Sequence, residues 1–93
     1  MTDFEMVKRC AEKMGIHVVP AHECWTQLVD GSYKKYDPLT DDAQAMALVK
    51  KFDLALYKTR NGFWIATHPE LLIGTSTNDD LNRAIVECVA RMP

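Results

Sequence analysis

Residues 54–67 read LALYKTRNGFWIAT, two β-prone runs that flank the dipeptide Asn61-Gly62. Asn-Gly is a strong hairpin signal because both residues accept the positive φ angles of a tight two-residue turn. Such a turn would place Thr59 opposite Trp64 and Tyr57 opposite Ala66. The pattern therefore predicts an antiparallel hairpin at the centre of the fold.

The assumed turn length also assigns residues to the two faces of this hairpin. One face would carry the apolar side chains of Leu54, Leu56, Phe63 and Ile65. The other face would carry Tyr57 and Trp64, and a different turn length would slip this register. Residues 71–75 predict a third strand, so we expect a three-stranded meander over about residues 53–76.

Three amphipathic helices surround the predicted meander. A capping box at Thr2 and Glu5 starts the first helix, which Gly15 ends. Its expected apolar stripe is Phe4, Val7, Cys10, Ala11 and Met14.

The second helix is expected from about Asp41 to Phe52, with Thr40 as its N-cap and aspartates in its first turn, where they meet the positive end of the helix dipole. Its apolar side is Ala45, Met46, Leu48, Val49 and Phe52. Residues 77–80 repeat this start and predict a last helix that begins near Asn78.

Residues 16–36 carry a weaker pattern. A short strand over residues 16–19 and a hairpin that joins residues 25–29 to 32–36 across Asp30-Gly31 are one reading. A loop is the other. The whole pattern predicts an α+β fold: one domain over residues 1–93, a single-domain sandwich in which the three-stranded antiparallel meander packs with three helices.

Length, charge and cysteines limit the classes of function. The chain has 93 residues, 47% hydrophobic and 26% charged, with a formal net charge of −2, so direct nucleic-acid binding is unlikely on electrostatic grounds. No signal-peptide pattern or apolar run of roughly 20 residues occurs, which predicts a cytoplasmic protein with no membrane partner. Three cysteines without CxxC spacing predict free thiols.

Candidate catalytic and metal-binding residues are present at spacings that predict no such site. His17, His22, Cys24, Cys10 and Cys88 are zinc-ligand types, but their spacing matches no zinc pattern. His68 before Glu70, or Cys24 as a nucleophile, lacks the further groups that catalysis requires. We expect no enzyme activity, no metal and no cofactor.

Candidate binding residues are aromatic and acidic. Aromatic rings are enriched in protein interfaces, and carboxylates at the helix starts could engage an arginine-rich surface, although capping alone explains them. A first helix that covers the Tyr57/Trp64 face would instead make those rings part of the core, and a homodimer could also bury them. The candidate binding residues are Trp25, Tyr33, Tyr36, Asp37, Asp41, Asp42, Tyr57 and Trp64.

Four segments carry a family resemblance. They are Tyr36-Asp37-Pro38-Leu39-Thr40-Asp41-Asp42-Ala43, Leu48-Val49, Gly62-Phe63-Trp64 and Asp80-Leu81-Asn82-Arg83-Ala84-Ile85. Over roughly residues 25–92, the chain resembles small tailed-phage proteins of the phage ABA sandwich domain family. The resemblance implies a compact helix/sheet/helix sandwich of phage origin and an accessory role, and it implies no activity for any residue.

These observations lead to three expected functions. The first is a phage-encoded binding protein that inhibits a host protein or protein complex by stoichiometric contact, with a CRISPR effector as the partner that we name first. The alternative is a homodimeric structural or accessory phage protein without a host target. A nucleic-acid-binding module stands third. Helix, three strands and helix is also the order of a double-stranded-RNA-binding domain, but Asn78-Asp79-Asp80 would repel phosphates at the start of its last helix.

Overall fold

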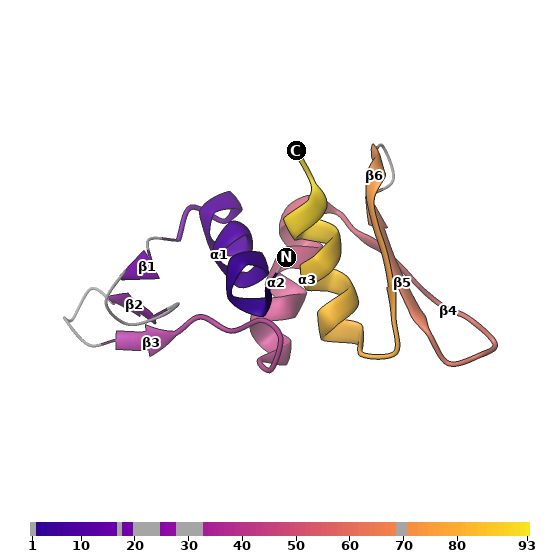
Figure 1. Cartoon of the computed structure of the whole chain (residues 1–93), viewed down its shortest axis with the longest axis horizontal. Helices are drawn as coiled ribbons and strands as arrows, with labels where there is room; N and C mark the ends of the chain where they lie inside the picture. Colours follow the sequence, from indigo (N-terminus) through magenta and orange to yellow (C-terminus); the bar gives the residue numbers. More distant parts are fainter. Residues whose placement is uncertain (1, 17, 20–24, 28–32, 69–70) are drawn as a thin grey trace.

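A computed structural model of the chain describes residues 2–16, 18–19, 25–27, 33–68 and 71–93. Within these residues the chain forms three helices and two three-stranded antiparallel sheets, an α+β fold. The sheet β1–β2–β3 lies at one end of an elongated molecule, the sheet β4–β5–β6 lies at the other, and the helices lie between them (Figure 1).

Helix α1 (Asp3–Lys13) begins at Thr2, whose hydroxyl accepts a hydrogen bond from the Glu5 N–H at 3.1 Å. The predicted N-cap is therefore confirmed. The predicted stripe is wrong at Phe4, which is 46% exposed, whereas Met6 is buried. The reason is that the buried side of α1 is centred on Met6, Val7 and Cys10, and Phe4 lies outside it.

The weakly patterned segment forms β1 (Val18–Val19), β2 (Trp25–Gln27) and β3 (Tyr33–Lys35). Strand β2 pairs antiparallel with both β1 and β3. The predicted strand and hairpin thus form one small sheet, while the predicted Asp30-Gly31 turn lies outside the described residues.

Helix α2 (Asp42–Phe52) begins one residue later than the sequence predicts. Its N-cap is Asp41, whose Oδ1 accepts the Gln44 N–H at 3.1 Å, and not Thr40. The Thr40 hydroxyl instead donates to Asp37 Oδ2 at 2.8 Å. Met46 was expected on the apolar side but is 41% exposed.

Strands β4 (Ala55–Lys58), β5 (Trp64–His68) and β6 (Leu71–Asn78) form the predicted antiparallel meander. Its predicted register is wrong by one residue, since Tyr57 pairs with Ile65 and Lys58 pairs with Trp64. The cause is the turn: the Thr59 N–H donates to the Phe63 carbonyl at 2.8 Å, which leaves three residues, 60–62, in the loop. Gly62 takes a φ of 86°, the left-handed conformation that three-residue hairpin loops use.

This slip exchanges residues between the two sheet faces. Leu54 and Ala66 are buried, and Leu56 and Trp64 pack against the core beside them. Tyr57 is 59% exposed and Phe63 43% exposed; with Ile65, they belong to the opposite face. The predictions that Ile65 shares a face with Leu56 and that Trp64 shares a face with Tyr57 are therefore wrong.

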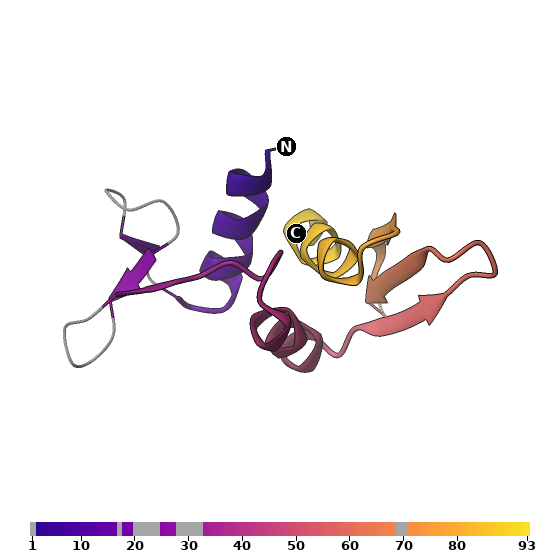
Figure 2. The same ribbon diagram turned by 90° about the horizontal axis from the view of Figure 1, so that it is seen from below.

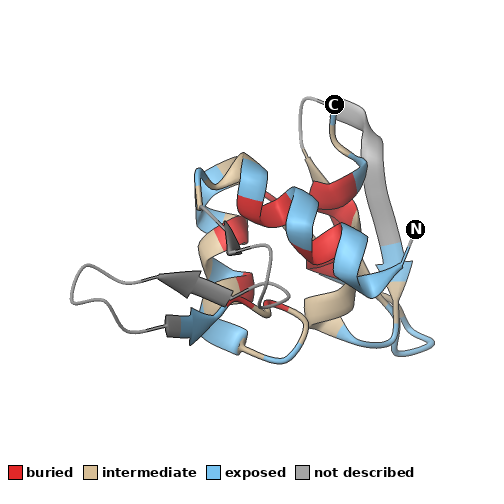
Figure 3. Ribbon diagram, turned by 60° about the vertical axis from the view of Figure 1, so that its left-hand side comes forward, coloured by how far each residue is buried: buried red, intermediate tan, exposed pale blue. Residues whose placement is uncertain are grey.

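Helix α3 (Leu81–Arg91) occupies the centre of the packing and contacts α1, α2, β5 and β6. Views from two directions show α3 between the sheet β4–β5–β6 and the other two helices (Figures 1 and 2). The buried residues of α1 lie along one side of the helix (Figure 3), and α1 packs against α3. The expectation that α1 would cover the Tyr57/Trp64 face is wrong, because α1 packs on the far side of α3.

The start of α3 also differs from the expected one. Strand β6 continues to Asn78, and the helix begins at Leu81 with Asp80 as its N-cap. The Oδ1 atom of Asp80 accepts the N–H groups of Asn82 at 3.0 Å and Arg83 at 3.4 Å.

Candidate functional site

The starts of the three helices converge on one side of the molecule. Arg83 of α3 donates from Nη2 to Asp3 Oδ1 of α1 at 2.7 Å, and Asn82 of α3 donates from Nδ2 to Asp42 Oδ1 of α2 at 2.8 Å. Both donors lie in the first turn of α3. Arg83 is 80 positions from its partner in the sequence, and Asn82 is 40 positions from its partner. The convergence gathers the acidic residues that cap or precede the helices.

We call this surface the acidic face and define it as Asp37, Asp41, Asp42, Asp79 and Asp80. Asp41 and Asp80 each use one carboxylate oxygen to accept backbone N–H groups at a helix start. Asp37 accepts from Thr40 and lies 3.8 Å from Lys35 Nζ. The adjacency of the two acidic helix starts, which the sequence only suggested, is thus a feature of the structure.

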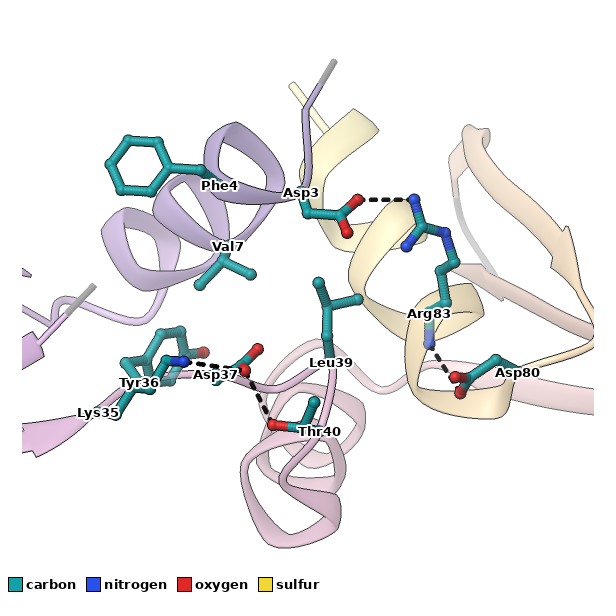
Figure 4. A pocket seen from close by; sticks show the side chains of 10 residues that line it. All are labelled: Asp3, Phe4, Val7, Lys35, Tyr36, Asp37, Leu39, Thr40, Asp80 and Arg83. Carbon is teal, nitrogen blue, oxygen red and sulfur yellow. Dashed lines mark hydrogen bonds and ion pairs between the residues drawn. The ribbon is translucent and has the colours of Figure 1, made fainter. Parts of the chain in front are cut away.

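A cavity of about 420 Å³ opens at this convergence. Figure 4 shows Asp3, Phe4 and Val7 of α1 on one side, Asp80 and Arg83 of α3 on another, and the segment from Lys35 to Thr40 closing the third. Both cations in the lining are engaged: Lys35 pairs with Asp37, and Arg83 pairs with Asp3 and with Glu87 at 3.2 Å. The hydrogen bond from Arg83 lowers the pKa of the Asp3 carboxyl, and the same bond raises the pKa of Arg83.

Gln44 holds the segment before α2 in place. Its Oε1 accepts the Asp37 N–H at 2.6 Å and its Nε2 donates to the Lys35 carbonyl at 3.1 Å. Through these two bonds, the first turn of α2 fixes the position of Asp37 on the acidic face. Sequence patterns gave no signal for this role of Gln44, because it depends on side-chain bonds to backbone atoms at the end of β3 and just after it.

A second cavity, of about 350 Å³, lies between the starts of α2 and α3. Its lining is Asp42, Met46, Asp80, Leu81, Asn82 and Ile85. Asp80 lines both cavities, so the two adjoin. The second cavity combines an apolar floor with two carboxylates and holds no basic residue in its lining.

The structure separates the eight predicted binding residues. Asp37, Asp41 and Asp42 belong to the acidic face. Tyr36 is buried in the core, and Trp64 packs against that core with Lys58 Nζ 5.5 Å from its ring centre. Tyr57 is exposed on the outer sheet face. Trp25 and Tyr33 fall on β2 and β3, and their side chains lie outside the described part of the structure.

The residue types that could support metal binding or catalysis are dispersed. Cys10 and Cys88 are buried free thiols, and Cys10 Sγ donates to the Val86 carbonyl at 3.6 Å. Within the described ranges, no group of three or more His, Cys, Asp or Glu side chains is arranged to hold a metal ion. His17, His22, Cys24 and Glu70 lie outside those ranges, and His68 is the last residue of β5. The absence of metal and of enzyme activity stays a prediction.

No protein-family model matches the chain, and neither a curated protein nor a solved structure is significantly similar to it. The resemblance to the phage ABA sandwich domain family stays a prediction. Among the described residues, none of the helices has both the length and the apolar character needed to cross a bilayer.

Proposed function

We propose that this protein is a phage-encoded, non-enzymatic binding protein that inhibits a host defence complex by stoichiometric contact in the host cytoplasm. A CRISPR effector is the partner that we favour. The observation that supports the proposal is the acidic face, where five aspartates lie at two helix starts that the side chain of Asn82 joins through Asp42. Defence complexes that bind nucleic acid present arginine- and lysine-rich channels, which such a face complements.

Rigidity adds to the charge argument. The carboxylates of Asp41 and Asp80 are fixed by capping bonds, Asp37 is fixed by Gln44, and Asp42 is fixed by Asn82. A surface that is already ordered loses less side-chain entropy when a partner binds. The acidic face therefore suits recognition of a basic protein surface better than the net charge of the whole chain, −2, suggests.

The test is affinity capture from a bacterial host that carries an active CRISPR system, together with phage plating on the same host. Wild-type protein should retain the effector complex at near-stoichiometric yield and restore plaque formation. The charge-reversal variant D42K/D79K, which leaves the capping residues Asp41 and Asp80 in place, should lose both effects while it remains folded.

The control for this experiment is Glu12→Lys, compared with Asp42→Lys alone, because both single variants change the net charge by the same amount. Glu12 is exposed near the other end of α1, away from the acidic face, so this variant should behave as wild type. Capture of no effector, with phage defence intact, would refute the proposal. Equal loss in the control variant would assign the effect to overall charge instead of the acidic face.

The second candidate function is a homodimeric accessory phage protein without a host target. It is favoured by the outer sheet face, where Tyr57 and Phe63 are exposed and neither Ile65 nor Thr67 brings a charge. Uncharged apolar sheet faces of this kind are often buried by association. Sedimentation of the wild type as a dimer, and of Tyr57→Lys as a folded monomer, would support this function over the first.

A further inference from the structure

The cavity between the starts of α2 and α3 has the chemistry of a site for one extended cationic side chain. Its floor is formed by Met46, Leu81 and Ile85, of which Ile85 is fully buried and Met46 is 41% exposed. Its rim carries Asp42 from α2 and Asp80 from α3. An apolar floor beneath an acidic rim matches a side chain that has methylene groups along its length and a positive charge at its tip.

Each rim carboxylate has one oxygen held by the protein and one left for a ligand. Asp42 uses Oδ1 for the Asn82 side chain, and Asp80 uses Oδ1 for the N–H groups of Asn82 and Arg83. Within the described residues, no donor binds the Oδ2 atom of either aspartate. Asn82 contacts both carboxylates and so fixes their relative positions across the cavity.

The positive ends of the helix dipoles do not cancel this negative charge. Each helix start contributes about half an elementary charge. The starts of α2 and α3 together contribute about one positive charge, against the two carboxylates of Asp42 and Asp80 in the lining. A cation is therefore attracted to the cavity, and an anion is repelled.

We propose that this cavity binds an arginine side chain of a partner protein. Guanidinium is planar and carries five donors, so one group can donate to carboxylates from two directions while its flat face and methylene groups cover Met46 and Leu81. A lysine ammonium is a compact, strongly hydrated charge and would gain less from the apolar floor. The inference rests on the proposed protein-binding function and names the group on the partner that the acidic face recognises.

The experiment titrates the full chain with the blocked peptide acetyl-Gly-Arg-Gly-amide and follows NMR signals of the Met46 methyl group and the Asn82 side-chain amide. The same peptide with citrulline in place of arginine has the same shape without the charge. Saturable shifts of both signals are expected with arginine. Affinity for the citrulline peptide should be lower by about tenfold, as expected for the loss of a charge-assisted contact.

Two variants make the result specific to this cavity. Asp42→Asn keeps an acceptor for Asn82 but removes the rim charge, and it should weaken arginine binding by about tenfold. Asp53→Asn removes the same charge at the opposite end of α2 and should bind as wild type. Equal binding of citrulline, equal loss in both variants, or shifts that avoid Met46 and Asn82 would overturn the inference.

The inference and the proposed function can fail separately. Arginine binding at the cavity without capture of any host complex would preserve the inference and refute the inhibitor function. Capture of the effector by both wild type and Asp42→Asn at equal yield would preserve the function and place its contact elsewhere on the acidic face.

Discussion

Arg83 and Asp3 join the first turn of α3 to the first turn of α1 through a hydrogen-bonded ion pair of 2.7 Å. The same guanidinium donates from Nε to Glu87 Oε1 at 3.2 Å, one turn further along α3. Since Asp3 is exposed and Arg83 is partly exposed, the pair orients the helices more than it stabilises them. Its strength depends on the ionised form of Asp3, whose pKa it lowers.

A double-mutant cycle with Asp3→Asn and Arg83→Gln should reveal favourable coupling between the two side chains at neutral pH and low salt. The folded-state pKa of Asp3 lies below the unfolded value, so this coupling is present above the unfolded pKa and is lost as the pH falls through the folded pKa. Urea unfolding of the four proteins at neutral and acidic pH measures it. Coupling that persists in acid or in molar salt would contradict the ion-pair account.

The corrected register of the hairpin predicts different costs for two aliphatic truncations. Leu48 of α2 is fully buried, so Leu48→Ala should lower the free energy of unfolding by about 2–5 kcal/mol. Ile65 faces outward beside Tyr57, so Ile65→Ala should cost less, about 1 kcal/mol from lost strand preference and partial burial. Urea denaturation of both variants measures the difference. If Ile65→Ala lowered the free energy of unfolding more than Leu48→Ala does, the result would support the two-residue turn.

The hairpin shows how far local sequence could predict the fold. Asn61-Gly62 located the turn, and the apolar periodicities located all three helices, because these signals act within a few residues. The length of the turn was not predictable in this way. The Thr59 hydroxyl accepts the Phe63 N–H at 3.1 Å and supports the three-residue loop, and the core then selects Trp64 over Ile65 as the inward residue.

The candidate site was predictable in its residues but not in its assembly. Aspartates at helix starts are visible in the sequence because capping is a local interaction. Asn82 and Arg83 gave no local signal, since their partners Asp42 and Asp3 lie 40 and 80 positions away. The burial of Tyr36 gave no local signal either, because it belongs to a core cluster that residues from distant parts of the chain form; its role in binding stays a prediction.

Asp53 and Gly62 take the left-handed conformation, with φ of 53° and 86°, and they predict opposite effects of substitution. Asp53 is the C-cap of α2 and holds a left-handed backbone conformation that glycine adopts without a steric cost. Asp53→Gly should therefore raise the free energy of unfolding by about 0.5–1 kcal/mol. Gly62→Ala should lower it by about 1–2 kcal/mol through strain alone, because a Cβ there meets no atom within 4 Å. Thermal unfolding monitored by circular dichroism tests both. A gain for Gly62→Ala would contradict the assigned turn.

Burial keeps the two core thiols protonated and makes stability depend on alkaline pH. Cys10 lies on the face of α1 toward α3, and its thiol donates to the Val86 carbonyl. Burial raises the pKa of the Cys10 thiol to about 12, and burial raises that of Cys88 to about 11, from an ordinary value of 9.0. Both thiols are therefore neutral in the folded protein at a pH where the unfolded chain ionises them.

The folded protein should lose stability as the pH rises through the window from about 9 to about 12. The sign follows from linkage, because a thiol with a raised folded pKa contributes fully below its unfolded pKa and loses that contribution above it. Between pH 8 and pH 10, Cys10 alone should account for about 1.4 kcal/mol of the decline. Urea unfolding of wild type and Cys10→Ser at both pH values isolates this share, since the two proteins differ only at this thiol. Equal declines would show that the Cys10 thiol already ionises in the folded state, and hence that α1 does not seal it from water against α3.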